Sequence, residues 1–139
     1  MADRDYSLFG DEHVRQYLES DGEVGHLWNG APCLVLWTTG RTSGETRVAP
    51  LIYGARGDDV VIVASKGGAP EHPAWYLNLA ANPGVEVQVG ADRYAGTART
   101  ATGDERGELW KLMTGVWPEY DEYQTRTDRQ IPVVVIERA

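Results

Sequence analysis

Short runs of apolar residues, separated by turn-forming glycine, proline and aspartate, make up most of the chain beyond residue 32. GVEVQVG at 84–90 alternates between apolar and polar positions, as a half-buried strand does, whereas CLVLWTT at 33–39 predicts a buried strand. Pro50 predicts an edge position or a bulge, because proline cannot donate to a strand ladder. Six strands are predicted, over residues 33–39, 45–55, 60–65, 84–90, 93–101 and 133–137.

Helical patterns cover less of the chain. Three helices are predicted, over residues 8–20, 74–82 and 104–117. Pro73 can begin the second helix, because its missing N–H would be unpaired there anyway, and Pro118 breaks the third. Thr102 and Glu105 have the spacing of a capping box before the third helix.

The order of these elements predicts the fold class. Strands and helices do not alternate regularly, and the short strands are joined by hairpin turns, so an antiparallel, mainly β fold with flanking helices is expected. A small split β-barrel satisfies this pattern. The 139 residues suit one domain overall. Within it, we expect an N-terminal helix and loop over 1–32 and the barrel over 33–139.

Composition narrows the partners. The formal net charge of −8 argues against nucleic acid and disfavours anionic membrane surfaces, both of which need basic faces. Cys33 is the single cysteine, so no intrachain disulfide forms. The first residues lack the apolar segment of a signal peptide, and no apolar run is long enough to span a bilayer. A cytoplasmic protein with at most peripheral membrane contact is expected.

One basic stretch departs from the acidic balance. Between Val24 and Arg56 the only acid is Glu45, while Arg41 and Arg47 flank the turn GRTSG. Arginine forks and backbone N–H groups beside glycines suit phosphates and carboxylates. The alternative is a solvated turn whose arginines pair with surface acids. Hydroxyl groups lie at or near the same turn, on Thr38, Thr39, Thr42 and Ser43.

A second candidate is ASKGGAPEHP, residues 64–73, where Lys66 follows a predicted strand and precedes two glycines. A cation beside flexible backbone donors, just before a helix, is typical of an anion site. The spacing is neither that of a P-loop nor that of a dinucleotide-binding fingerprint. An ordinary surface loop is the alternative.

The third candidate is the aromatic set Trp117, Tyr120 and Tyr123, whose three-residue spacing shares one face if the segment is helical. Tyrosine hydroxyls can hydrogen-bond a substrate oxygen, and the rings can line a flat pocket. The alternative is a packed lid over the barrel end.

Other chemistry finds little support. The three histidines, His13, His26 and His72, have no metal-ligand spacing, and no nucleophile motif such as GxSxG occurs. Two basic, glycine-bearing loops and an aromatic wall suit a protein that binds an anionic cofactor and leaves the difficult chemistry to it.

Three segments, TTGRTSGETRVAPL, VASKGGAPEHPAWYLNLAANPGVEVQVG and YDEYQTRTDRQIPVVVIE, resemble the deazaflavin-dependent nitroreductase family. The likeness runs from about residue 34 to residue 137. It implies a split β-barrel that binds coenzyme F420, a deazaflavin with a phosphate-bearing oligoglutamate tail. It also implies hydride transfer from the reduced cofactor to a quinone, a nitroaromatic or another activated conjugated acceptor.

The resemblance also implies roles for single residues. Tyr120, Tyr123 and Ser65 would face the substrate, as candidates for stabilising charge or donating a proton. Small split barrels often pair, so a homodimer is compatible with the prediction. The implied cofactor contacts are Arg41, Thr42, Ser43, Arg47, Pro50, Ile52, Ala64, Ser65, Lys66, Gly67, Trp75, Tyr76 and Asn78.

The chain departs from the family pattern at three positions. Thr42 stands where many members have lysine, Ile52 where an aromatic is common, and Trp117 where tyrosine is frequent. The last two change the pocket wall, so activity on nitroimidazoles does not follow. Three other hypotheses stay open: an FMN-dependent split-barrel enzyme, a non-catalytic deazaflavin carrier, and a protein-interaction domain without a small ligand.

Overall fold

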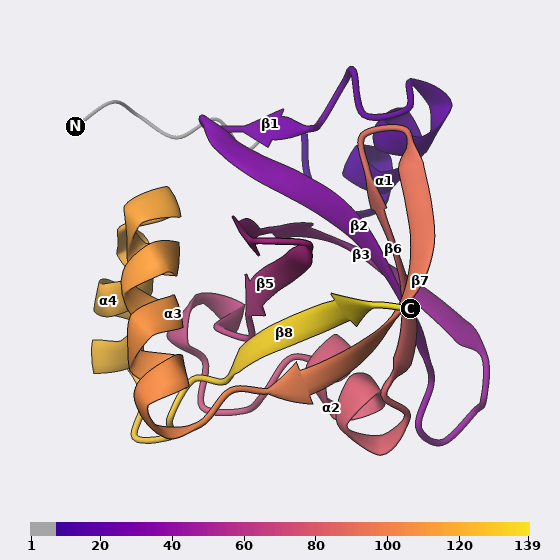
Figure 1. Ribbon diagram of the computed structural model, residues 1–139. Coiled ribbons are helices and arrows are strands. Elements are labelled where there is room, and N and C mark those ends of the chain that lie inside the picture. The colour runs from indigo at the N-terminus through magenta and orange to yellow at the C-terminus, as the bar shows by residue number, and fades with distance from the viewer. Residues whose placement is uncertain (1–7) are drawn as a thin grey trace.

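The computed structural model describes residues 8–139, in which an antiparallel sheet curls into a half-barrel flanked by helices (Figure 1). The expected N-terminal unit at 1–32 lies partly outside these residues. The four α-helices are α1 (Gly10–Glu19), α2 (Ala74–Ala81), α3 (Gly103–Val116) and α4 (Glu119–Thr125), with one 3-10 turn, η1 (Lys66–Gly68). The strands are β1 (Leu27–Trp28), β2 (Ala31–Thr39), β3 (Thr46–Ile52), β4 (Gly54–Arg56), β5 (Asp59–Val63), β6 (Gly84–Val89), β7 (Asp92–Thr100) and β8 (Val133–Arg138).

The strand order explains the curl. The sheet runs β1-β2-β6-β7-β8-β5-β4, every pairing is antiparallel, and β3 pairs with β2 at the end opposite β4. Because β3 and β4 are consecutive in the chain, the two ends of the sheet meet at Tyr53 without a ladder between them. The predicted split barrel is therefore confirmed. Pro50 lies on the edge strand β3, opposite Val35, which confirms its expected edge position.

Two of the predicted strand assignments were wrong. The single strand expected over 45–55 is two strands, because the chain bends at Tyr53 where Gly54 packs tightly against Met113. Residues expected to form a loop also contain the two-residue strand β1.

The capping box does not form. Thr102 is the N-cap of α3 but makes no side-chain capping bond. The Glu105 carboxylate instead accepts hydrogen bonds from Arg99 and from Arg56, at 2.9 Å. Charge-assisted hydrogen bonds to two guanidinium groups are stronger than a hydrogen bond to one backbone N–H, so the Glu105 carboxylate binds the arginines.

Strand alternation produces two cores from the same strands. On β5 and β8, Ile62 and Ile136 face the barrel interior and pack with Leu79 of α2, while Val61 and Val135 face the core beside α3. Figure 1 shows α3 and α4 together on one side of the barrel, away from α1. Both faces of these strands are buried, which is why their sequences are continuously apolar.

Helix α1 is fastened to the barrel by Tyr17, which is fully buried. Its hydroxyl donates to the carbonyl of Cys33 at 3.0 Å and accepts from the N–H of Gly90 at 2.6 Å. Buried hydroxyls need such partners, so this tyrosine ties α1 to β2 and to the β6–β7 turn.

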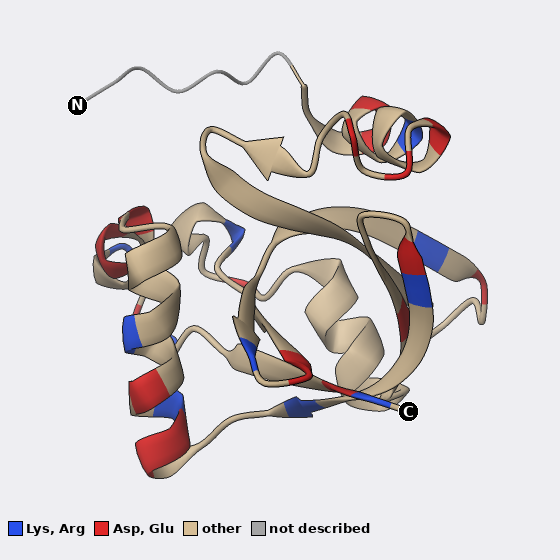
Figure 2. Ribbon diagram, turned by 45° about the horizontal axis from the view of Figure 1, so that its top comes forward, with Lys and Arg blue, Asp and Glu red and all other residues tan. Residues whose placement is uncertain are grey.

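Acidic residues are grouped at the starts of three helices. Acidic side chains occupy the first turns of α1, α3 and α4, while the turn between β2 and β3 carries Glu45 alone (Figure 2). None of the helices within residues 8–139 is long and apolar enough to cross a membrane. The basic hairpin is thus a local exception on an acidic surface.

Candidate active site

Two pockets adjoin at Trp75, which lines both. The first, the hairpin pocket, has a volume of about 440 Å³. The second, the aromatic pocket, has a volume of about 450 Å³. The hairpin pocket is lined by Thr38, Gly40, Arg41, Thr42, Ser43, Arg47, Val48, Ala49, Ala74, Trp75 and Asn78. The aromatic pocket is lined by Phe9, Gly10, His13, Trp28, Cys33, Pro50, Leu51, Ile52, Val63, Ser65, Lys66, Gly67, Pro73, Trp75, Trp117, Tyr120 and Tyr123.

The turn that forms the hairpin pocket is held by its own backbone. Gly40 donates its N–H to the carbonyl of Glu45 at 2.7 Å and accepts from Gly44 at 2.9 Å. A Cβ on Gly40 would lie 2.6 Å from the Ser43 hydroxyl oxygen, so a side chain there would displace that hydroxyl. The Ser43 hydroxyl accepts from the N–H of Glu45 at 3.1 Å. The arginines therefore project from an ordered turn.

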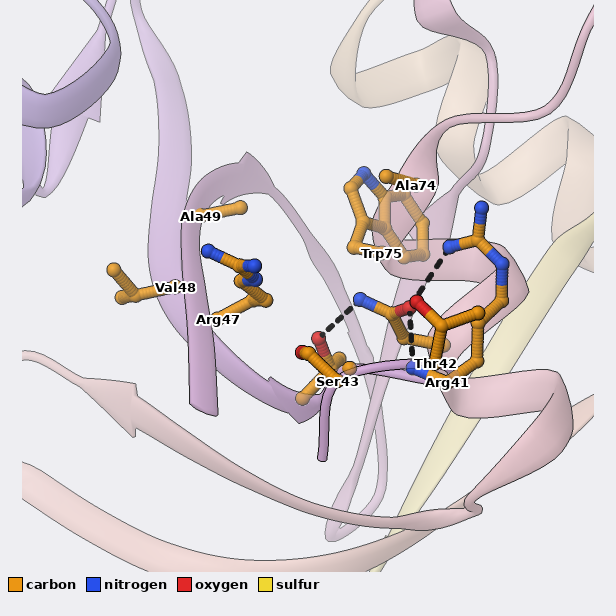
Figure 3. Close-up of a pocket in the computed structure, with 11 residues that line it drawn as sticks. Arg41, Thr42, Ser43, Arg47, Val48, Ala49, Ala74 and Trp75 are labelled. Atoms are coloured by element: carbon orange, nitrogen blue, oxygen red, sulfur yellow. Dashed lines mark hydrogen bonds between the residues drawn. The ribbon is translucent and has the colours of Figure 1, made fainter. Parts of the chain in front are cut away.

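Asn78 fixes the position of Arg41. The Asn78 side chain is buried, and its Oδ1 accepts from the Arg41 backbone N–H at 3.2 Å and from Arg41 Nη1 at 3.0 Å (Figure 3). Its Nδ2 donates to the Thr38 hydroxyl at 3.3 Å. With both ends of its amide engaged, Asn78 serves the pocket mainly by orienting the guanidinium.

Arg47 reaches the same space from β3, and Figure 3 shows Arg41 and Arg47 on either side of Trp75. Arg47 pairs with Glu45 at 3.4 Å, with the two side chains 59% and 70% exposed. Exposed pairs of this kind are weak, so a stronger anion can take the guanidinium. Arg47 therefore pairs with a surface acid, as the solvated-turn alternative expected. Both Arg41 and Arg47 nevertheless line the hairpin pocket.

The loop after β5 offers a second anion-binding geometry. Ser65 is right-handed, at φ −78° and ψ −40°, and Lys66 and Gly67 are left-handed, at φ 47° and φ 63°. Successive right- and left-handed residues turn their N–H groups into one concavity that suits an anion. Within residues 8–139 the N–H groups of Lys66 and Gly67 donate to no other group. Lys66 itself forms an exposed pair with Glu71 at 3.1 Å.

Gly68 seats this loop against α4. A Cβ at Gly68 would lie 2.5 Å from the carbonyl oxygen of Tyr123, and its φ of +85° also favours glycine. Any larger residue would push the loop away from the tyrosine-bearing helix.

The aromatic pocket has a wall of stacked and edge-on rings. Trp28 and Trp117 lie 5.5 Å apart between centroids at 31°, and Tyr120 and Tyr123 lie 6.1 Å apart at 74°. The segment after Pro118 is helical, and Trp117, Tyr120 and Tyr123 all line this pocket, as their spacing predicted. Flat rings at these angles suit a flat ligand.

Tyr120 combines burial with a free hydroxyl. Its side chain is only 5% exposed, and its hydroxyl has no hydrogen-bond partner among the residues that the structure describes. Burial raises the pKa of Tyr120 well above its usual value. The group therefore stays protonated and can donate. The hydroxyl of Tyr123 accepts from the indole N–H of Trp117 at 3.4 Å.

Two of the predicted contact residues line neither pocket. Ala64 is fully buried. The hydroxyl of Tyr76 shares a hydrogen bond of 3.0 Å with that of Thr100. The other predicted residues line the hairpin pocket (Arg41, Thr42, Ser43, Arg47, Trp75, Asn78) or the aromatic pocket (Pro50, Ile52, Ser65, Lys66, Gly67, Trp75, Tyr120, Tyr123).

Several lining residues were not predicted. Phe9, His13 and Trp28 come from the N-terminal region, so residues on both sides of the expected division at 32 build the aromatic pocket. His13 is buried, and its Nε2 lies 2.8 Å from the carbonyl oxygen of Gly25. Cys33 also lines the pocket, where burial raises the pKa of its thiol to about 12. No sequence motif marks these residues, because the fold alone brings α1 and β1 to the pocket.

The part of the chain that the structure describes holds no cluster of metal-ligating side chains. No group of three or more histidine, cysteine, aspartate or glutamate side chains within residues 8–139 could hold a metal ion.

The fold is a split barrel with a polar pocket beside an aromatic one. Comparison with known proteins identifies the class as F420-dependent reductases. Residues 10–138 match the model of the F420H(2)-dependent quinone reductase family. An F420H(2)-dependent quinone reductase of Mycobacterium tuberculosis is 42% identical over 130 residues, covering 91% of this chain and 87% of that protein. The chain belongs to the F420H(2)-dependent quinone reductase family.

Solved structures agree. An F420-H2 dependent reductase, FDR-A, is 47% identical and superposes with a TM-score of 0.72, over 76% of this chain and 94% of that one. A structure described as a domain-swapped dimer is 42% identical with a TM-score of 0.75, over 91% of this chain and 95% of the other. The resemblance seen in the sequence is confirmed at the level of the family and the fold.

Proposed function

We propose that this protein transfers a hydride from reduced coenzyme F420 to a quinone in the joined hairpin and aromatic pockets. The observation that carries the proposal is Trp75, which lines both pockets and so places them next to each other. A ligand with an anionic tail and a flat ring matches a site with arginines at one end and aromatic rings at the other.

The hairpin pocket fits the tail of the cofactor. Arg41 and Arg47 offer forked N–H donors, and Ser43 adds a hydroxyl, which together match carboxylate and phosphate oxygens. Thr42 contributes a neutral hydroxyl where many relatives have lysine, so the charge there rests on the two arginines. The concave N–H groups of Lys66 and Gly67 supply a second place for an anionic oxygen.

The aromatic pocket fits a ring and an acceptor together. Pro50, Ile52 and Trp75 offer apolar and aromatic surface, and Tyr120 and Tyr123 close the opposite side from α4. When bound in its reduced form, the deazaflavin supplies the hydride. The residues of the pocket hold ring and acceptor in contact and exclude water.

Tyr120 is the group best placed to stabilise the acceptor oxygen. Negative charge develops on that oxygen as the acceptor is reduced, and the protonated hydroxyl of this buried side chain can donate to it. Ser65 and Tyr123 line the same pocket and can assist. Nitroaromatic and other activated conjugated compounds are further candidate acceptors, because they also place charge on an oxygen.

The test is a titration of the purified protein with F420, followed by cofactor fluorescence, with FMN in parallel. Saturable binding of F420 with weak binding of FMN, followed by oxidation of reduced F420 when a menaquinone-like acceptor is added, supports the proposal. Tight F420 binding without turnover on quinone or nitro acceptors indicates a carrier. Binding of FMN alone indicates a flavin enzyme, and binding of neither leaves an interaction domain.

A homodimer is proposed as the state in solution, since a structure 42% identical to this chain is described as a domain-swapped dimer. Light scattering coupled to size-exclusion chromatography decides it, because the chain mass is 15.3 kDa and a dimer doubles that value.

A further inference from the structure

Arg129 uses its guanidinium on the loop before α2. Its Nε donates to the carbonyl of Ala69 at 2.9 Å and its Nη2 to the carbonyl of Ser65 at 2.8 Å. Its Nη1 donates to the carbonyl of Ala64 at 3.1 Å and lies 3.0 Å from Nδ1 of His72. Four of the five N–H groups of the side chain are therefore directed at the segment 64–72.

This arginine pairs with no carboxylate within 4.0 Å among residues 8–139, unlike most arginines on this surface. Partial burial lowers its pKa. Burying part of this cation against three backbone carbonyls removes some of its hydration. The rigid, planar guanidinium in turn holds several acceptors in fixed positions at once.

Arg129 is itself fastened to α4. The Gln124 side chain donates its Nε2 to the carbonyl of Arg129 at 2.8 Å and accepts from the N–H of Ile131 at 2.9 Å. Gln124 lies on the same short helix as Tyr120 and Tyr123. The guanidinium therefore links the helix that carries the tyrosines to the loop that carries the concave N–H groups.

The direction of the carbonyls matters for the opposite edge of the loop. The carbonyls of Ala64, Ser65 and Ala69 point to Arg129, and the N–H groups of Lys66 and Gly67 are left without an internal acceptor. The arginine thus holds the backbone in the arrangement that presents those N–H groups to an anion.

We propose that Arg129 is a positioning residue that fixes segment 64–69 against α4 and so presents its N–H groups to the phosphate-bearing part of the cofactor. The assignment of the ligand rests on the proposed function. The positioning of the loop does not, since it is a property of the protein alone.

The first experiment needs no cofactor. Hydrogen exchange of segment 64–72 is compared in the wild-type protein, Arg129→Lys and the control Arg138→Lys, whose guanidinium pairs with Asp92 at 2.8 Å on the far strands. Lysine keeps the charge but loses the fork. We expect exchange in segment 64–72 to rise on the order of tenfold in Arg129→Lys, with the amides of β5 and β8 unchanged and the control like wild type.

The second experiment measures affinity. Wild type, Arg129→Lys and Arg138→Lys are titrated with F420 and with the same chromophore lacking the phosphate-bearing tail. We expect Arg129→Lys to weaken F420 about tenfold and the tailless chromophore less than about threefold. A general loss of folding would instead lower the melting temperature and weaken both ligands alike, so this contrast separates positioning from stability.

The outcomes are distinct. Unchanged exchange in segment 64–72 of Arg129→Lys overturns the positioning role, whatever the cofactor does. Faster exchange with equal weakening of both ligands overturns the assignment to the phosphate. Faster exchange in a protein whose wild type does not bind F420 retains the positioning role and rejects the proposed function.

Discussion

The hairpin pocket presents Arg47 on an exposed strand end, whereas the aromatic pocket presents the hydroxyl of Tyr120, whose side chain is buried. Arg47 is more than half exposed and pairs weakly, while the Tyr120 side chain is almost fully buried. The two pockets share Trp75 but would contribute to function through different interactions. Charge on an exposed turn supplies affinity for an anionic tail, and a hydroxyl on a buried side chain stabilises charge that appears only during reaction. Binding and turnover should therefore respond to different substitutions.

The largest difference between the effect on cofactor binding and the effect on turnover is expected from the double variant Arg41→Gln/Arg47→Gln. It removes both guanidinium groups from the hairpin pocket, so the Kd for F420 should rise about 100-fold, while kcat at saturating cofactor changes little. Fluorescence titration and steady-state kinetics measure the two quantities. Arg93→Gln, which removes an arginine paired with Glu86, is the matched control. A fall in kcat at unchanged Kd would contradict the division of labour.

Tyr120→Phe tests the other pocket. Loss of the hydroxyl should lower kcat roughly 30-fold while the Kd for F420 stays near wild type. Tyr123→Phe should have a smaller effect, because that hydroxyl is shared with Trp117. Tyr94→Phe, on a residue that lines neither pocket, is the control. If both variants at 120 and 123 retain full turnover, neither tyrosine assists the reaction.

Asn78 connects the turn to α2, and its variants sharpen the comparison within the hairpin pocket. Asn78→Ala leaves Arg41 and Thr38 without their partner, so the Kd for F420 should rise about tenfold. Asn78→Asp keeps the acceptor for Arg41 but cannot donate to Thr38 and should lose less. Equal affinities for the two variants would show that Arg41 needs no orienting group.

The smallest effect is expected from pH. Burial, and then the charge of Arg129, lowers the pKa of His72 from its usual value of 6.5. The unfolded chain therefore binds more protons at His72 than the folded protein just below that value, so the free energy of unfolding falls as the pH falls through it. Denaturant unfolding at about pH 7.5 and 5.5 should show a smaller loss in His72→Gln than in wild type. Gln keeps an acceptor for Arg129 but does not titrate, so equal losses would exclude His72.

The sequence predicted the longer strands well, because the burial pattern of each is visible in its own residues. Alternation at 84–90 and the apolar run at 33–39 are consequences of which faces are buried, and both strands lie where expected. Local patterns were less informative where a tertiary contact decides. The bend at Tyr53 depends on packing of Gly54 against Met113, and Glu105 is taken by two arginines rather than by its own helix.

The candidate site shows the same limit. Arg41, Lys66 and Tyr120 stand in segments whose composition already suggested anions and aromatic rings, and each lines a pocket. His13 and Arg129 carry no such signal, because their importance lies in distant backbone carbonyls that only the fold brings near. Residues that act on backbone groups are invisible to motif reasoning, since any sequence can supply a carbonyl.

The position of Pro50 on the edge strand has a consequence for behaviour in concentrated solution. An edge strand is a template on which another chain can add a strand, and such growth leads to aggregates. Within residues 8–139, β3 pairs only with β2, so its other edge lacks a strand partner, and the strand lines the aromatic pocket. Proline removes a donor from that edge, and the charged Arg47 further along β3 makes it a poor surface for stacking. The edge of β3 beside the ligand pocket is thus also protected against the addition of strands from other chains.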